Sequence, residues 1–72
     1  STDYDDLVIR GDHSDGRKFS AFYLKQGRVI AVDAINSPQD FMFGKQIITQ
    51  KLLVDKVSLS DPGVSLKDFL KK

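Results

Sequence analysis

The stretch DAINSPQDFMFGKQIITQ, Asp33 to Gln50, takes the chain from a strand into a helix. Ser37 is a typical N-cap residue, and Pro38 suits the first helical position. Asp40 complements the positive end of the helix dipole. The sequence therefore predicts a helix from Pro38 to about Leu52. Three large apolar residues follow one another in this helix, so they cannot all face one core.

A helical wheel of this segment indicates one apolar face. Residues at helical spacing are expected to form the core face: Phe41, Gly44, Ile48 and Leu52. Gly44 would let the helix approach a sheet closely, because it has no side chain. Ile47 lies at the margin of this face. Met42 and Phe43 point elsewhere, which leaves them for another purpose.

Three strand candidates precede the helix: DLVIRGD (6–12), RKFSAFYLK (17–25) and RVIAVDAIN (28–36). Gln26 and Gly27 form a two-residue link that is typical of a tight hairpin. In the first strand Leu7 and Ile9 share one face, and Val8 and Arg10 share the other. Alternation divides the second strand into two sets: Phe19, Ala21 and Tyr23 against Ser20, Phe22 and Leu24.

The third strand is apolar on both faces. Its two sets are Ile30, Val32 and Ala34 against Val29, Ala31 and Ile35, interrupted by Asp33. A strand with this pattern is covered on both sides. We therefore expect a part of the molecule outside these residues to cover one face of the sheet.

The C-terminal segment adds shorter elements. Val57 and Leu59 indicate a short turn of helix or an apolar anchor, and SDPG (60–63) predicts a turn. Ser65 suits the N-cap of a last short helix, with Asp68 three residues later. Leu66, Phe69 and Leu70 of this helix would dock against the rest of the domain. The fold class is α+β within a single domain, residues 1–72: a three-stranded antiparallel meander, one main helix and a short C-terminal helix.

Composition excludes several functions. Eleven basic and ten acidic residues give a net charge of +1, which argues against a nucleic-acid binder. No apolar run approaches the length of a membrane span. The 72 residues contain no cysteine, so disulfides and zinc–thiolate sites are excluded, and a reducing cytoplasm is expected.

Candidates for chemistry are few. Asp12, His13 and Asp15 lie together in GDHSDG, where a solvated hairpin loop is favoured over a metal or acid–base site. Asp33 is either a buried functional carboxylate or, as we favour, a strand-face residue near the sheet edge that bonds to the backbone or to an arginine, for which Arg10 and Arg28 are the candidates. Nothing combines a nucleophile, a general base and an oxyanion site. The residues therefore predict a binding or interface domain rather than a complete enzyme.

Basic residues crowd the C-terminal half: Lys45, Lys51, Lys56, Lys67, Lys71 and Lys72. They form either a solvated face or a basic patch that steers an acidic protein partner. Met42 and Phe43 beside Lys45 suit the second interpretation, because an interface combines an apolar centre with a charged rim.

Four motifs, in order, carry a family resemblance: VIRGD, FSAFYL followed by GRVIAVDAIN, SPQDFMFGKQII and DPGVSLKDFL. The resemblance covers nearly all of the chain, from Tyr4 to Leu70. The chain resembles the C-terminal domain of the FAD-dependent, NADH-using ferredoxin reductases of bacterial oxygenase systems. The resemblance implies the interface-domain fold of glutathione-reductase-like flavoenzymes, packed beside the flavin. It also implies a [2Fe–2S] ferredoxin as the partner and a cytoplasmic location.

The resemblance places Lys67 on the ferredoxin-facing side, with Lys45 as a weaker candidate. Met42 and Phe43 complete the expected partner-binding set. FAD and NADH belong to the full-length enzyme, and the chain alone is expected to bind neither, because it lacks both glycine fingerprints. Its partners would be the FAD- and NAD-binding domains of the same polypeptide and the ferredoxin.

The start STDYDD has no initiator Met and precedes a strand almost at once, so we expect a piece of a longer reductase. The alternative is a free-standing, non-catalytic interaction module. A family strand and a tryptophan-containing segment would precede this stretch. A sheet edge without that strand predicts self-association into a homo-oligomer.

Overall fold

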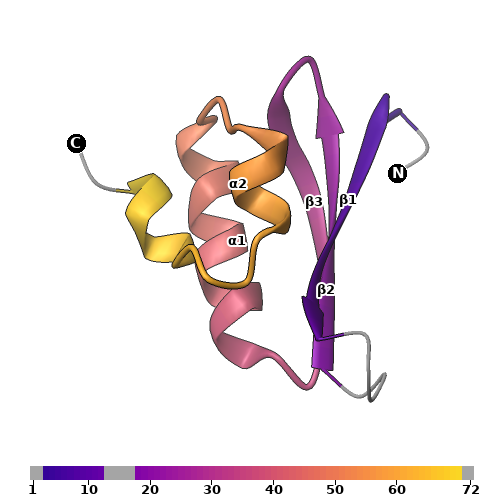
Figure 1. Ribbon diagram of the computed structural model, residues 1–72. Coiled ribbons are helices and arrows are strands. Elements are labelled where there is room, and N and C mark those ends of the chain that lie inside the picture. Colours follow the sequence, from indigo (N-terminus) through magenta and orange to yellow (C-terminus); the bar gives the residue numbers. More distant parts are fainter. Residues whose placement is uncertain (1–2, 13–17, 71–72) are drawn as a thin grey trace.

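A computed structural model describes residues 3–12 and 18–70. Three strands, β1 (Asp6–Asp12), β2 (Lys18–Lys25) and β3 (Arg28–Ile35), form an antiparallel sheet in the order β1-β2-β3. The helix α1 (Pro38–Gln50), the short helix α2 (Lys56–Ser60) and the 3₁₀ helix η1 (Leu66–Leu70) follow. All three lie on the same side of the sheet (Figure 1). The α+β meander with a main helix and a short C-terminal helix is confirmed.

The link between β2 and β3 has the predicted hairpin geometry. Gln26 and Gly27 both have positive φ, 54° and 81°. Two successive positive φ values twist the turn in the sense that the flanking strands require.

Strand alternation holds in β1 and β2. Val8, Phe22 and Leu24 are buried toward the helices, whereas Leu7 and Ile9 remain exposed on the opposite face. The face division predicted for these two strands is confirmed.

Alternation fails in β3, because of a bulge. Leu24 pairs with Val29 and Tyr23 pairs with Ala31, so Ile30 has no partner of its own. An unpaired extra residue resets which face the following side chains occupy. Val29 and Val32 therefore both face the helices, and the predicted grouping of Val29 with Ala31 and Ile35 was wrong.

The start of α1 follows its local sequence. Ser37 occupies the N-cap position, and its carbonyl accepts from the Phe41 amide, at 3.1 Å. Its hydroxyl donates instead to the carbonyl of Ile35. The helix ends at Gln50, two residues earlier than expected, where Lys51 adopts the left-handed conformation with φ 54°.

The predicted core face of α1 was rotated wrongly. Gly44 is buried as expected, but Ile47 is fully buried, and Phe43 packs against the core cluster. Phe41, predicted to be core, is 45% exposed. The helix contacts both the sheet and η1, so its buried sector is centred between these two neighbours. A helical wheel that considers the sheet alone therefore places the centre of the buried face about a quarter of a turn from its true position.

The C-terminal segment closes the core through two leucines. Leu59 of α2 and Leu66 of η1 are 0% and 2% exposed, and Phe69 and Leu70 pack against the same cluster. The turn predicted at SDPG (60–63) forms one residue later, at 61–64: the Val64 amide donates to the Asp61 carbonyl, at 3.0 Å, and the Asp61 carboxylate accepts from the Gly63 amide, at 2.9 Å. Val57, in contrast, is exposed, so Leu59 alone is the anchor of α2.

A buried arginine connects the sheet to these later elements. Arg10 of β1 is 6% exposed. One of its terminal nitrogens donates to the carbonyls of Leu59 and Asp61, at 3.1 and 2.9 Å, and the other donates to the carbonyl of Val64. Its Nε lies 3.7 Å from the carboxylate of Asp40 on α1. The guanidinium thereby connects β1 to main-chain carbonyls at the end of α2 and in the segment before η1.

Replacing Gly44 tests the close approach of helix and sheet. A Cβ at this position would lie 3.1 Å from a Val32 methyl and 3.2 Å from the Phe22 ring. We expect Gly44→Ala to lower the free energy of unfolding by about 1 kcal/mol net, since overpacking outweighs the gain in helix propensity. Urea denaturation measures this, with exposed Gln46→Ala as the control. A Gly44→Ala midpoint at or above the wild-type value would contradict the packing.

Replacing Arg10 tests the buried connection. Arg10→Met removes the cation beside the partly exposed Asp40 carboxylate and the side-chain donor of the Leu59 and Val64 carbonyls, so we expect a loss of about 3 kcal/mol. Arg10→Lys should also destabilise, because one ammonium cannot reproduce the planar fork. Arg28→Met is the matched control: Arg28 is exposed and donates from Nε to the Lys51 carbonyl. Equal denaturation midpoints for Arg10→Met and Arg28→Met would show that the connection contributes nothing.

Candidate functional surfaces

The outward side of α1 carries exposed apolar side chains beside a cation. Phe41 and Met42 are 45% and 50% exposed. The ammonium of Lys45 lies 5.3 Å from the centroid of the Phe41 ring, as the i, i+4 spacing allows. A cation over a ring face is attracted by the ring quadrupole, which orders both side chains. Phe41, Met42 and Lys45 are called the α1 patch below.

Lys67 projects from η1, which packs against α1. Leu66 beside it is buried, whereas Lys67 itself is exposed. The four residues predicted to bind a partner therefore divide into two groups. Met42, Lys45 and Lys67 are accessible on neighbouring elements, and Phe43 is half-buried against the core.

Phe41 was missed as an accessible aromatic residue. The buried stripe of α1 runs through Asp40, Phe43, Gly44, Ile47 and Ile48, at the i, i+3, i+4, i+7, i+8 spacing of a core face. The polar Asp40 at its start hides the pattern. Had Asp40 been counted as a core-facing residue with a polar partner, the wheel would have placed Phe41 outside.

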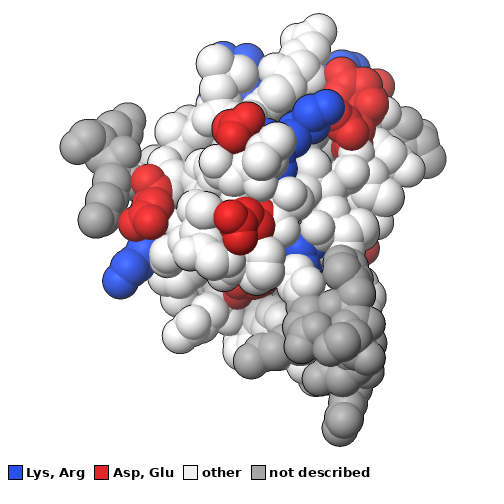
Figure 2. All heavy atoms as spheres, viewed as in Figure 1, with Lys and Arg blue, Asp and Glu red and all other residues white. Residues whose placement is uncertain are grey.

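Charge on the visible side of the molecule is mixed. Acidic and basic side chains are interspersed in Figure 2, without an extended area of one sign. On this face, a charged partner would therefore respond to a few local groups among the described residues.

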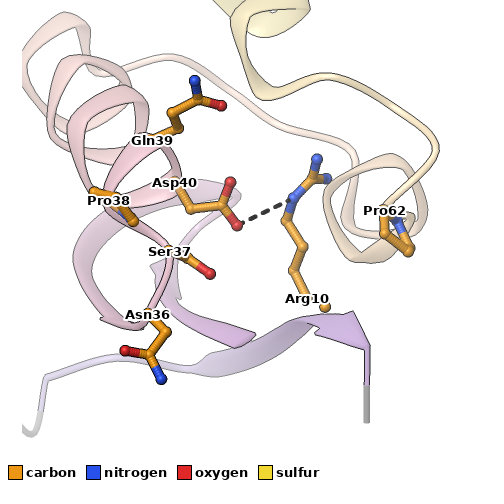
Figure 3. A pocket seen from close by; sticks show the side chains of 8 residues that line it. Arg10, Asn36, Ser37, Pro38, Gln39, Asp40 and Pro62 are labelled. Carbon is orange, nitrogen blue, oxygen red and sulfur yellow. Dashed lines mark ion pairs between the residues drawn. The ribbon is translucent and has the colours of Figure 1, made fainter. Parts of the chain in front are cut away.

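One hollow adjoins the start of α1. It has a volume of about 630 Å³, and eight residues line it: Arg10, Gly11, Asn36, Ser37, Pro38, Gln39, Asp40 and Pro62. Figure 3 shows Arg10 reaching from β1 toward Asp40, with Pro62 on its other side. The Asp40 carboxylate also accepts from the Ser20 hydroxyl, at 2.9 Å. The charges at this hollow are thus matched to one another, and the arrangement is typical of a structural connection.

Asp33 lies on the exposed face of the sheet. It accepts from the Tyr23 hydroxyl, at 3.4 Å. The expected arginine partner was wrong, because Arg10 pairs with Asp40 of α1 on the opposite face of the sheet from Asp33, and Arg28 donates to the Lys51 carbonyl. Partial desolvation and the nearby Asp33 carboxylate raise the pKa of the Tyr23 phenol above its usual value.

The remaining candidates give no site that the structure can describe. The side chains of Asp12, His13 and Asp15 lie outside the described residues. Within residues 3–12 and 18–70, no group of three acidic, histidine or cysteine side chains is placed to hold a metal ion. Over the same residues, no helix is both long enough and apolar enough to cross a bilayer.

Comparison with known proteins gives matches over most of the chain. A probable ferredoxin reductase from Castellaniella defragrans is 47% identical over 64 residues, which is 89% of this chain and 15% of that protein. Putidaredoxin reductase from Pseudomonas putida is 43% identical over 70 residues, 97% of this chain and 16% of that protein. The chain therefore spans about a sixth of the length of these relatives.

The fold is also similar to a solved structure. The crystal structure of the covalent putidaredoxin reductase–putidaredoxin complex matches with a TM-score of 0.86 and 43% identity, over 97% of this chain and 16% of that chain. A family model described as "Reductase C-terminal" matches residues 1–70. The chain therefore belongs to the Reductase C-terminal family, the C-terminal domain of ferredoxin reductases.

Proposed function

We propose that this chain acts as the C-terminal domain of an FAD-dependent, NADH-using ferredoxin reductase in the cytoplasm. In this role it packs beside the flavin and helps to dock a [2Fe–2S] ferredoxin, which passes electrons to an oxygenase. The observation that carries the proposal is the match, at 43% identity, to a reductase whose crystal structure is a covalent complex with putidaredoxin.

The accessible surface of α1 and η1 supports the docking role. The α1 patch combines apolar area with one cation, and Lys67 adds a second cation on the adjoining element. An interface with an apolar centre and a charged rim uses the centre for affinity and the rim for steering. In this proposal Phe41 takes the contact role expected of Phe43, since Phe43 serves the core.

The fold supports an assignment of FAD and NADH binding to another part of the reductase. Nucleotide-binding domains hold pyrophosphate at a glycine-rich turn between a parallel strand and a helix. Here the strands are antiparallel, and the joint between β3 and α1 reads Asn36-Ser37-Pro38, without glycine. We therefore assign FAD and NADH to the other part of the polypeptide. The residues of this chain present a surface and do not take part in hydride or electron chemistry directly.

Flavin binding by the 72-residue chain tests this division. We expect no saturable change in flavin fluorescence when the purified chain is titrated with FAD at micromolar concentrations. The full-length reductase, stripped of flavin, serves as the positive control. Saturable quenching by the short chain would place a flavin site on residues that the proposal leaves out.

Lys67→Glu in the full-length reductase tests the docking role. NADH-dependent reduction of a small dye should stay intact, because that reaction needs no ferredoxin. The ferredoxin concentration for half-saturation should rise about three- to tenfold at low ionic strength, since reversing a rim charge is worth roughly 1 kcal/mol. The difference should shrink with added salt, because salt screens exposed charges.

Lys51→Glu is the matched control for this measurement. It makes the same charge change at the opposite end of α1 from Phe41 and should leave the half-saturating ferredoxin concentration unchanged. If Lys67→Glu reduces ferredoxin as well as wild type at every ionic strength, Lys67 is only a solvated helix residue.

A further inference from the structure

The helices cover only one face of the sheet (Figure 1). The pairing of the strands places three rows on the other face: Leu7–Tyr23–Ala31, Ile9–Ala21–Asp33 and Gly11–Phe19–Ile35. These rows, together with Tyr4, are called the open sheet face. Tyr4 belongs to it because its ring stacks edge-on against Tyr23, with the centroids 4.9 Å apart.

The open sheet face is apolar to an extent that a solvent-facing sheet is not. Leu7, Ile9 and Ile35 are 45%, 37% and 47% exposed. They surround Ala21, which is only 7% exposed although no helix covers it. A contiguous apolar area of this kind on a soluble domain marks an interaction site.

The polar groups on this face are prepared for burial. Asp33 is the one charged residue in the three rows, and Tyr23 already donates a hydrogen bond to it. A buried polar group costs free energy unless it has a partner, so a pre-formed pair lowers the penalty of covering the face. The rows contain no lysine or arginine, which makes them unsuited to an acidic ferredoxin.

We propose that the open sheet face is the surface on which this domain docks against the nucleotide-binding part of its own polypeptide. The inference rests on the proposed function and assigns it to two separate surfaces. The relatives are about six times longer than this chain, because the matched region is only 15–16% of each, so a large part of such a polypeptide is available as the occupant. The α1 patch and Lys67, on the other side of the sheet, stay free for ferredoxin.

Hydroxyl-radical footprinting of the full-length reductase tests the assignment. After correction for intrinsic reactivity, Leu7, Ile9 and Ile35 should be oxidised about fivefold more slowly than Phe41, because a close-packed interface excludes solvent. In this chain alone these side chains are similarly exposed, so any difference reports the docking. Equal oxidation rates in the monomeric enzyme would overturn the proposal.

Two variants sharpen the test. Ile9→Asp places a charge in the open sheet face and should abolish the protection of Leu7 and Ile35, whereas Ile9→Val should retain it. Leu53→Asp is the control: Leu53 is 66% exposed, lies outside the three rows and should leave the protection intact. If Ile9→Asp does not fold, the wild-type and Ile9→Val footprints still decide.

Other occupants give different results. Protection that appears only at concentrations where the enzyme dimerises would assign the face to a second copy, and protection that needs added ferredoxin would assign it to ferredoxin. Either result overturns the proposal. A reductase that shows the protection but fails to reduce any ferredoxin would contradict the proposed function and leave the docking surface standing.

Discussion

The guanidinium of Arg10 is the interaction on which the arrangement of this domain depends. It leaves β1, passes between α1 and the 61–64 turn, donates hydrogen bonds to three main-chain carbonyls and forms an ion pair with the Asp40 carboxylate. Leu59 and Leu66 hold the last segments by packing, and in a domain of 72 residues this apolar burial gives only marginal stability. A buried cation with all its acceptors in place fixes those segments, because every other arrangement leaves the charge unpaired. The positions of α2 and η1, and hence of Lys67, follow from this constraint.

The consequence is a domain with two unlike sides. One side is a sheet whose apolar rows have a single carboxylate, and the other is a helical layer with accessible cations. In the role proposed above, the domain packs against the rest of a reductase and also meets a ferredoxin, and such a separation suits both contacts. Permanent interfaces are mainly apolar, whereas transient ones use charge to speed encounter. Gly44 allows α1 to pack close to β2 and β3. The sheet surface and the helical surface therefore lie on opposite sides of a thin domain.

Local signals predicted much of this structure from the sequence. The alternation in β1 and β2, the Gln26–Gly27 turn and the Ser37–Pro38 helix start each depend on a few neighbouring residues. The features that were missed depend on residues far apart in the chain. The buried sector of α1 is set partly by η1, and the main-chain acceptors of Arg10 lie 49 to 54 residues away from it. Periodicity in one segment does not show which distant residues pack against it. For this reason Phe41 was predicted in the core, and Asp33 was predicted to pair with an arginine.

The bulge at Ile30 has a consequence for the outer edge of the sheet. β3 is an edge strand, and a bulge increases local twist and disrupts a regular ladder. On the edge that faces away from β2, Leu53 already forms a bridge to Arg28, and the Val54 amide donates to the Gly27 carbonyl. The first part of β3 is thus blocked, and an added strand could pair in register only along its second half. An unprotected edge is a template for aggregation, so β3 carries its own protection against uncontrolled strand addition.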